Sequence, residues 1–583
     1  MKRAKMTGWY DPARLISIAV RVVISTVFGE FADRREAMAA AREIDPDALD
    51  SAYDYRTASE VPFWFDYVAD VGEGWDSTFA IARLLSQRKL VVEGLPEELP
   101  TGRILVMGGD QVYPTASRED YAQKFLAPYA EAARINDFPA SDQTADVFAI
   151  PGNHDWYDGL SSFLGVFCSR RNADAWAEPR KGRVIGGRQT RQTRSYFAIA
   201  LPQNWWIWGT DIQLDGYIDQ PQLDFFAHVA KCWMPPGSKV ILCTAEPTWM
   251  YVDVNDPEKN EFKNFSYMEG VISQPERGHR LALVLTGDSH HYGRWTEGDR
   301  NYIVAGGGGA FLHPTHNLTD KIFDWPYPPP GEPEIPGVDS YRRDFKIVDP
   351  ATGTPRTFPD ANTSRALTWR NLAFAYLNPR YAALMGFLAA IFAWLLSFIA
   401  LSYGTTLHDA LAPAGQGSFP LALKAYFTLL LSSPWPALML LAAGAGYVYF
   451  SDYRHWGLRI MAGGLHALAQ FAVSVSATVL IALYAPFASF TPLLILYIGV
   501  ISGILSATLL GGYLILCLNW RGQHWDEAFS SLRIADYKNF LRLRIDADGS
   551  LTIFPIGLKK VPHDEQSPSP LKPHLIESPI RII

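Results

Sequence analysis

The sequence is poor in cysteine and has no concentration of positive charge. Only 4 of its 583 residues are cysteine, and no two of them have the CxxC spacing of a metal-binding pair. This spacing excludes a zinc ribbon and a disulfide framework, and it is typical of proteins in reducing compartments. The formal net charge is -8, so we expect no broad basic surface and no nucleic-acid partner. A GxxxxGK[ST] loop for nucleoside triphosphates is also absent.

The N-terminal stretch does not have the pattern of a signal peptide. Lys2 and Arg3 resemble the basic start of one, but Asp11 and Arg14 bring charge back before any apolar run. We interpret "RLISIAVRVVISTVFGEF" as a mostly apolar helix with a narrow polar stripe. Arg21 argues against a membrane span, which leaves two alternatives: an interfacial helix or a helix buried against the protein.

Up to about residue 345, short apolar runs alternate with polar or helical stretches, the pattern of an α/β domain. The expected strands are "WFDYVAD", "GRILVMGGD", "ADVFAIPG", "SYFAIALP", "WWIWGTD", "KVILCTAEP", "LALVLTGDS" and "YIVAGGGG". Several of these strands end on polar residues. Side chains at the carboxyl rim of a sheet converge on one crevice, so we look for the functional site there.

Beyond residue 380 the chain has four long hydrophobic runs without a charged residue in the middle. They cover 381–403, 425–450, 460–484 and 491–518. Each is at least as long as the roughly 20 residues that cross the hydrocarbon core of a bilayer. We predict four transmembrane helices, with Pro434 and Pro436 kinking the second.

Basic residues flank these runs mostly on one side. They are Arg365, Arg370, Arg380, Arg454, Arg459 and Arg521. Because positively charged residues stay in the cytoplasm, we predict that both termini and the α/β domain are cytoplasmic.

Composition divides the chain into six parts. We expect an N-terminal helical segment (1–55), the α/β domain (56–345), a linker (346–380), four transmembrane helices (381–520), a cytoplasmic helix and hairpin (521–560) and a flexible tail (561–583). The hairpin should turn at Asp548–Gly549. Because an isolated hairpin is marginally stable, we expect it to pack on the α/β domain or extend its edge.

The polar strand ends carry the chemistry. They are Asp70, Asp110, the run Asn153-His154-Asp155, and Asp288 with His290. Two divalent cations held close together need one bridging carboxylate and several further oxygen and nitrogen ligands. Carboxylate, amide and imidazole groups suit Mn, Fe, Zn or Mg. We therefore predict two divalent metal ions at this rim.

The order Asp, Gly-Asp, Gly-Asn-His-Asp, Gly-x-x-His resembles the calcineurin-like metallophosphoesterases over about residues 60–310. The resemblance implies a fold of two facing β-sheets flanked by helices. It also implies a dinuclear metal site and hydrolysis of phosphate esters by a metal-bound hydroxide.

The same resemblance assigns roles to individual residues. Asp110 would bridge the metals, and Asp70 and His290 would bind the first of them. Asn153 would bind the second. The catalytic residues implied by the resemblance are His154, assisting the leaving group or the transition state, and Asp155, orienting His154.

Three histidines of the family pattern are missing. Gly72, Ala245 and Asp288 stand in their places. Asp288 keeps an oxygen ligand, and Glu246 is the candidate to replace the imidazole missing at Ala245. The candidates for the gap at Gly72 are Glu73 and Asp76. The replacements fit a carboxylate-rich site, and they equally fit a weakened or lost metal.

Two further patterns have alternative interpretations. In "AGGGGAFLHPTH", His313 and His316 could face the site, or the glycines could serve a tight crossing between strands. Gly499-x-x-x-Gly503 allows close helix packing or a homodimer.

Taken together, the sequence predicts a membrane-anchored phosphoesterase that acts on a phosphomonoester or phosphodiester, from a small molecule or a lipid head group. The alternative is a non-catalytic sensor that binds a metal or a phosphorylated ligand. A transporter is disfavoured, because the hydrophobic runs have almost no polar residues that could line a path.

Overall fold

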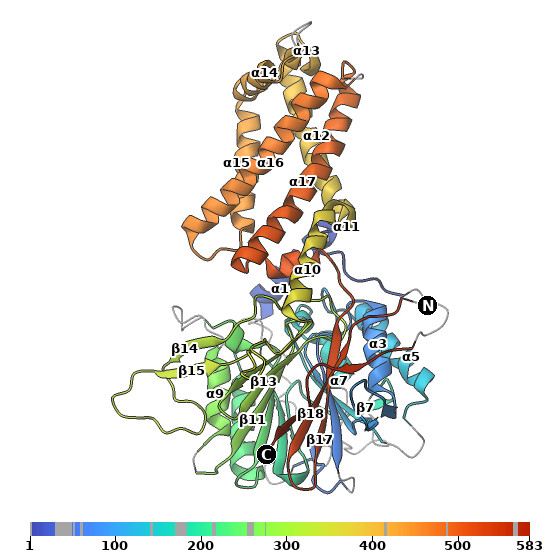
Figure 1. Ribbon diagram of the computed structural model, residues 1–583, viewed down its shortest axis with the longest axis vertical. Helices are drawn as coiled ribbons and strands as arrows, with labels where there is room; N and C mark the ends of the chain where they lie inside the picture. The colour runs from blue at the N-terminus through green and yellow to red at the C-terminus, as the bar shows by residue number, and fades with distance from the viewer. Residues whose placement is uncertain are drawn as a thin grey trace. The chain divides into compact units, whose positions relative to one another are not determined.

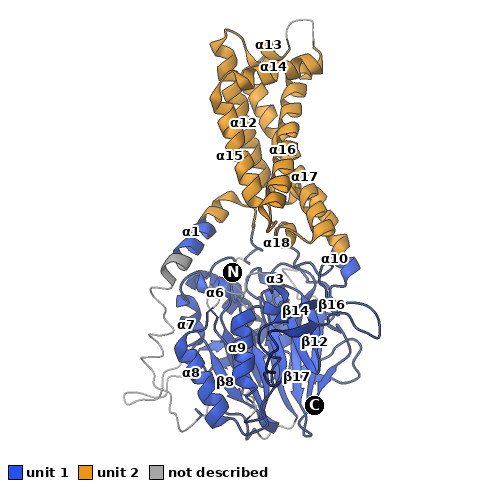
Figure 2. Cartoon of the chain, turned by 90° about the vertical axis from the view of Figure 1, so that its left-hand side faces the viewer, with its two compact units in different colours: residues 1–7, 17–364, 533–583 blue, residues 8–16, 365–532 orange. Residues whose placement is uncertain are grey.

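The computed structural model describes residues 3–29, 49–50, 53–58, 62–139, 144–168, 183–212, 217–252, 262–274, 276–412, 417–485, 488–563 and 570–583. The chain forms two compact units (Figure 2). Unit 1 comprises Met1–Thr7, Ser17–Ser364 and Arg533–Ile583, and unit 2 comprises Gly8–Ile16 and Arg365–Leu532. Unit 1 is therefore discontinuous in sequence.

Unit 1 contains a nine-stranded sheet whose order is β19-β18-β17-β1-β4-β5-β7-β6, with β20 also pairing with β18. Its strands are β1 (Phe63–Val68), β4 (Ile104–Gly108), β5 (Asp146–Ile150), β6 (Val184–Ile185), β7 (Arg188–Thr190), β17 (Lys538–Ile545), β18 (Leu551–Leu558), β19 (His574–Leu575) and β20 (Ile580–Ile582). Strands β1, β4 and β5 are parallel, so their carboxyl ends lie at one edge of the sheet.

A seven-stranded sheet has the order β16-β12-β13-β11-β10-β9-β8. Its strands are β8 (Phe197–Ala200), β9 (Trp205–Gly209), β10 (Lys239–Cys243), β11 (Arg280–Thr286), β12 (Tyr292–Glu297), β13 (Arg300–Ala305) and β16 (Thr357–Phe358). Strands β9, β10, β11 and β13 run parallel. All eight strands expected from the sequence are present.

The two sheets enclose a shared apolar core. Val106 of β4 and Ile241 of β10 both belong to it, whereas their neighbours Met107 and Leu242 point to the outer faces. This alternation is the period of two that a strand imposes on its side chains. Helices α3 (Trp75–Leu85) and α5 (Ala127–Asn136) cover the outer face of the nine-stranded sheet, and α8 (Gln220–His228) and α9 (Phe262–Ile272) cover that of the other. Unit 1 is thus a mixed α/β fold with helices outside two β-layers.

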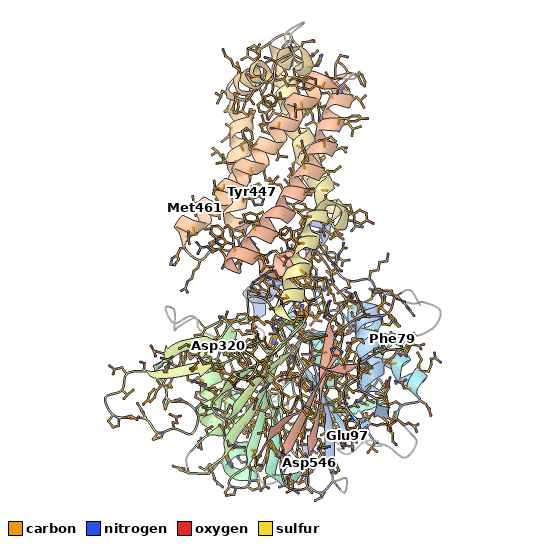
Figure 3. The ribbon with its side chains drawn as sticks, in the orientation of Figure 1. Phe79, Glu97, Asp320, Tyr447, Met461 and Asp546 are labelled. Carbon is orange, nitrogen blue, oxygen red and sulfur yellow. The ribbon has the colours of Figure 1, made fainter. Side chains whose placement is uncertain are left out.

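The C-terminal hairpin is built into the nine-stranded sheet. Strand β17 pairs antiparallel with β1, and in Figure 1 the red β17 and β18 lie among strands from much earlier in the chain. Arg542 Nε donates to Asp66 Oδ1 at 2.7 Å, with both side chains fully buried. Removing Asp66 would leave the buried Arg542 without its carboxylate and cost about 3–5 kcal/mol, whereas Asp66 keeps a second buried cation, Arg188 at 3.9 Å. The hairpin turns after Asp546, labelled in Figure 3, through Gly549 at φ +80°.

Two predicted segments have more structure than their composition indicated. In the tail predicted to be flexible, β19 and β20 both pair with β18. Ile582 is buried in the core between the sheets, so apolar burial fixes this end of the chain; residues 564–569 lie outside the described residues. The predicted linker 346–380 contains β16, which pairs with β12, and the helix α10 (Ala361–Thr368).

Unit 2 consists mainly of apolar helices. Three are long and apolar enough to cross a membrane: α12 (Pro379–Ser402), α16 (Trp456–Tyr484) and α17 (Thr491–Arg521). The second predicted span is instead two helices, α14 (Phe419–Leu431) and α15 (Pro434–Phe450), bent by 94° at the break between them. Ser433 is extended there because the following proline disfavours helical backbone. The described residues thus contain three candidate spans, or four if the bent pair counts as one.

The glycine motif of α17 serves packing within the chain. A Cβ on Gly503 would lie 2.4 Å from the carbonyl oxygen of Ala382, and one on Gly499 would lie 3.0 Å from that of Gly386. Both carbonyls belong to α12. Close packing of α12 on α17 therefore accounts for these glycines.

Helix α1 (Pro12–Gly29) exposes apolar side chains. The exposed residues are Leu15, Ile16, Val20, Val23 and Ile24. Arg21 donates from Nη1 to Thr115 Oγ1 at 3.1 Å. The exposed apolar face contradicts a helix buried against the protein and favours the interfacial alternative.

Candidate metal centre

The carboxyl ends of the parallel strands bring the predicted site residues to one rim of unit 1. Asp70 follows β1, Asp110 follows β4, and Asn153 begins the short helix α6 (Asn153–Trp156) after β5. Asp288 and His290 follow β11 of the second sheet. Asp70, Asp110 and Asp288 have φ angles of +56°, +50° and +64°. Left-handed backbone at non-glycine residues is costly and concentrates at functional sites, so three such aspartates at one rim indicate one.

A residue not singled out from the sequence, Tyr113, occupies the centre of this rim. Its hydroxyl oxygen lies 2.7 Å from Asp70 Oδ1, 3.0 Å from Asp110 Oδ2 and 2.9 Å from His290 Nε2. Asp70 Oδ1 and His290 Nε2 are themselves 3.8 Å apart. All four side chains are buried. A phenol has a single hydrogen and can donate it to only one of the two carboxylates at a time.

These four side chains offer ligand atoms for a metal ion, but the ligand atoms of Asp70, Asp110 and His290 do not all lie within 4.8 Å of one another in the described structure. One ion could bind all three only after side chains move toward it. Neighbouring ligand atoms around a first-row ion with bonds of about 2.1 Å lie roughly 3.0–3.4 Å apart. The Tyr113 oxygen lies 2.7–3.0 Å from its three partners, which are hydrogen-bond distances, and Asp70 Oδ1 and His290 Nε2 are 3.8 Å apart, somewhat more than that value. Asp70 Oδ2 and His290 Nδ1 are also buried without a hydrogen-bond partner among the described residues. The cluster thus offers three oxygen ligands and one nitrogen ligand that the protein's own hydrogen bonds do not fully satisfy.

The second metal position is less complete. Asn153 Oδ1 is buried and has no hydrogen-bond partner in the described part of the chain, as a ligand oxygen would. Asp110 Oδ1, however, accepts the backbone N–H of His154 at 2.9 Å. Asp288 Oδ2 accepts the hydroxyl of Tyr251 at 3.1 Å. With Ala245 in place of an imidazole, the described side chains do not enclose a second ion.

The residues expected to fill the gap at Gly72 are engaged elsewhere. Glu73 accepts the backbone N–H of Phe311 at 2.6 Å, and Asp76 lies 2.9 Å from His563 Nδ1. A Cβ at position 72 would lie 2.1 Å from the carbonyl oxygen of Gln111. The backbone therefore has no space for any side chain at Gly72, and the missing histidine cannot be restored there without movement.

His154 is placed at the rim, where the carbonyl oxygen of Pro114 fixes its ring. His154 Nδ1 lies 2.7 Å from the carbonyl oxygen of Pro114 and so must donate to it, which makes Nε2 the acceptor of the neutral ring. Asp155 accepts the backbone N–H groups of Gly152 and Gln111 and the hydroxyl of Tyr121. These contacts brace the loop that carries the site, and the positioning role of Asp155 stays a prediction.

Burial disfavours the charged form of both central carboxyl groups, those of Asp70 and Asp110. Burial raises the pKa of Asp110 to about 7. Burial and the neighbouring charge of Asp110 raise the pKa of Asp70 well above its usual range. Burial, reinforced by His313, lowers the pKa of His290 well below its usual range, so this ring is a neutral ligand at physiological pH. A cation among these groups would relieve the repulsion between the two carboxylates.

The glycine run forms a tight crossing and also carries a histidine into the site. Cβ atoms at Gly307 and Gly308 would lie 2.0 Å from Asn539 Nδ2 and 2.4 Å from the carbonyl oxygen of Ala69. Beyond the crossing, the His313 ring stacks on His290 with centroids 3.8 Å apart. His316 instead contacts Ser364 Oγ at 2.9 Å.

Lys538, from the C-terminal hairpin, reaches the same region. Its ammonium group donates to the carbonyl oxygen of Ala310 and is fully buried. Burial lowers its pKa to about 8, against the opposing charges of Glu73, Asp536 and Asp70. The hairpin thus supplies a positive charge close to the acidic centre.

Sequence reasoning missed Tyr113, Lys538 and the stacking role of His313. The spacing Asp110-x-x-Tyr113 was a usable signal, because a residue three positions after a strand-end aspartate can turn back toward it. Nothing local to Lys538 pointed to the site, since its placement depends on the pairing of β17 with β1. Among the described residues, the only trio of His, Cys, Asp or Glu ligand atoms lying within 4.8 Å of one another is Asp452, His524 and Glu527, in unit 2.

Comparisons with known proteins give distant structural matches only. No protein family and no curated protein matches the sequence. Similar solved structures include GAP50, the anchor in the inner membrane complex of Plasmodium, at 11% identity and a TM-score of 0.30, and PhoD, at 10% identity and a TM-score of 0.27. Each match covers 44% of this chain, with 74% of GAP50 and 58% of PhoD. At these TM-scores the assignment of function depends on the chain's own residues.

Proposed function

We propose that unit 1 is a metal-dependent phosphoesterase whose first metal position would be formed by Asp70, Asp110, Tyr113 and His290, with their side chains drawing together around the ion. The observation that carries the proposal is the convergence of these four buried side chains on the Tyr113 hydroxyl. The donor set, of carboxylate, phenol and imidazole, suits Fe, Mn or Zn. In this proposal Asp288 and Glu246 lie near the site but do not bind the metal at this position.

The surrounding residues supply the rest of the chemistry. A bound metal would act as a Lewis acid on the phosphate and would activate water. The amide oxygen of Asn153, buried and without a partner in the described part of the chain, is available as a further ligand on this side. The His154 ring, held by Pro114, can donate a proton from Nε2 to the leaving oxygen when it is protonated.

The substrate class that fits is a phosphomonoester or phosphodiester, from a small molecule or a lipid head group. Helices α12, α16 and α17, with the bent α14–α15 pair as a fourth span, would hold the enzyme in a membrane. The basic residues flanking the helices favour a cytoplasmic position for both termini and for unit 1. Such an anchor would keep the site near head-group substrates.

A second candidate function is non-catalytic binding of a metal or a phosphorylated ligand. The observation that favours it is the incomplete second position, where Ala245 offers no ligand and Asp288 is bonded to Tyr251. Hydrolysis assisted by two metals would be lost in such a site, while binding at the first position would remain.

One experiment separates the two candidates. Metal content of the purified, detergent-solubilised chain is measured by mass spectrometry, and hydrolysis of p-nitrophenyl phosphate and its bis ester is assayed with added Mn²⁺. We expect bound metal and turnover in the parent chain, and neither in Asp110→Asn. The matched control Asp137→Asn, a carboxylate whose side chain is 95% exposed, should keep both. Metal without turnover would support the binding function, and turnover that persists in Asp110→Asn would refute the assigned centre.

A further inference from the structure

Unit 2 contains a second group of potential ligands, far from the strand ends in sequence. Asp452 lies between α15 and α16, and His524 and Glu527 lie at the start of the short helix α18 (Trp525–Ser530). One ligand atom from each residue lies within 4.8 Å of the other two. Three donors from two separate segments are therefore brought to one point.

His524 is the side chain that distinguishes this group from an ordinary acidic surface. It is fully buried, although it lies beside two carboxylates. Its Nδ1 atom has no hydrogen-bond partner among the described residues and lies 3.6 Å from Glu527 Oε2. On the other side of the ring, Nε2 accepts the backbone N–H of Asp452 at 3.4 Å and lies 3.2 Å from the Tyr513 hydroxyl.

The distance between His524 Nδ1 and Glu527 Oε2 fits two ligands of one metal ion better than a hydrogen bond. A separation of 3.6 Å is too long for a hydrogen bond between Nδ1 and the carboxylate. It is close to the roughly 3.4 Å between two ligands of a tetrahedral zinc ion with bonds of about 2.0–2.1 Å. In this structure Nε2 accepts the backbone N–H of Asp452, so the hydrogen of the neutral ring is on Nδ1. For Nδ1 to bind an ion, the ring hydrogen must move to Nε2, where the Tyr513 hydroxyl can accept it, in exchange for the long bond from Asp452. Metal-bound histidines commonly have such a partner on the second nitrogen.

Solvent can reach this point from the carboxylate side. Asp452 is exposed, and the side chain of Glu527 is 37% exposed. Asp452 Oδ2 also accepts the backbone N–H of His524 at 2.9 Å, so the two segments are already joined by a hydrogen bond. Three protein ligands leave a position for water, which is typical of an exchangeable ion.

We propose that Asp452, His524 and Glu527 bind a divalent first-row cation such as Zn²⁺, which ties the segment between α15 and α16 to the start of α18. The imidazole nitrogen and two carboxylates are ligands that Zn²⁺ accepts. This site is separate from the strand-end centre and does not depend on the function proposed for unit 1.

The test is a Zn²⁺ titration of the full chain in detergent after treatment with a chelator. It uses an Asp110→Asn background, so that the strand-end centre does not contribute. Calorimetry should show about one Zn²⁺ per chain, and Co²⁺ in its place should give visible absorption bands. Glu527→Gln, a conservative change at a half-exposed side chain, should raise the dissociation constant about 10-fold or more. His524→Ala should abolish binding.

The matched control is His455→Ala, an exposed histidine close to Asp452 in sequence, which should bind Zn²⁺ as the background chain does. Unchanged gel-filtration behaviour of Glu527→Gln establishes that this variant folds, so its result stands even if His524→Ala misfolds. Absence of bound Zn²⁺ in the background chain would overturn the proposal. Unchanged affinity in Glu527→Gln would overturn it equally.

Discussion

The two sheets of unit 1 contribute unequally to the strand-end site. The nine-stranded sheet supplies Asp70, Asp110 and, just beyond β4, Tyr113. The seven-stranded sheet supplies His290, but at its other two positions it has Ala245 and Asp288, the latter bonded to Tyr251. One side of the site is thus buried and convergent, while the other has lost an imidazole and satisfied its carboxylate within the protein.

This difference shows that a possible metal position depends on side chains that meet at one point, and not on the number of acidic residues nearby. Glu73, Glu246 and Asp288 are all close in sequence to the strand ends. Yet Glu73 bonds to the backbone of Phe311 and Asp288 to Tyr251. Only the side chains that meet at Tyr113 remain available as a group.

The strongest way to break the comparison is to exchange a carboxylate for an amide on each side. Asp110→Asn should remove bound metal, with the affinity falling by at least about 100-fold, and turnover should drop to background. Asp288→Asn should keep bound metal, because that carboxylate does not belong to the convergent group. Metal analysis and the two phosphate-ester assays measure both. Equal losses in the two variants would remove the distinction between the sheets.

His154→Ala separates chemistry from binding on the convergent side. The variant should retain metal and lose roughly 10²–10⁴-fold in turnover, because the proton donor to the leaving oxygen is gone. Its backbone N–H, which binds Asp110, is unaffected by the change. Loss of metal along with turnover would instead mean that the ring itself helps to hold the ion.

Tyr113→Phe tests whether the phenol oxygen binds the metal or whether the side chain only fills the space between the other ligands. The aromatic ring remains while the oxygen at the centre of Asp70, Asp110 and His290 is lost. We expect metal affinity to fall about 10- to 100-fold, measured by competition with a chelator of known affinity. Unchanged affinity would restrict the ligand set to the two carboxylates and the imidazole.

Lys538 extends the comparison to pH. Its pKa in the folded chain is about 8, below the usual value of 10.5, so between these pH values the unfolded chain binds the extra proton. Stability should therefore rise with pH across this window, by up to about 3 kcal/mol from this group. Thermal unfolding of the parent and of Lys538→Met at about pH 7.5, 9 and 10.5 isolates the contribution of Lys538 to the stability. Parallel pH profiles in the two chains would contradict the buried lysine.

The smallest effect is expected at Glu246. Its replacement by Ala asks whether this carboxylate stands in for the imidazole missing at Ala245. Because it lies outside the group that meets at Tyr113, we expect metal content to change by less than the error of the measurement. A clear fall in metal content would restore Glu246 as a ligand.

The sequence predicted the strands and the aspartates at their ends because both are local patterns. Short continuous apolar runs define β4 and β5, and the polar residue that follows each strand is placed by the strand itself. Tyr113, Lys538 and the β19 and β20 pairings depend on contacts between distant segments, which no local pattern encodes. The contact between Tyr121 and the Asp155 carboxylate was not foreseen for a similar reason, since Tyr121 comes from another helical segment. The break before Pro434 was signalled by proline, but the 94° bend was not.

The pairing of β17 with β1 has a consequence for how the protein is made. Arg542 and Asp66, which bind each other across this pair, are 476 positions apart, and all the candidate membrane helices lie between them. During translation β1 leaves the ribosome early, but its neighbour is synthesised only after the last hydrophobic helix. The edge of β1 must therefore stay unpaired, and open to chaperones or to misassembly, until the helices have been delivered to the translocon. Completion of unit 1 is thus coupled to the prior synthesis of unit 2.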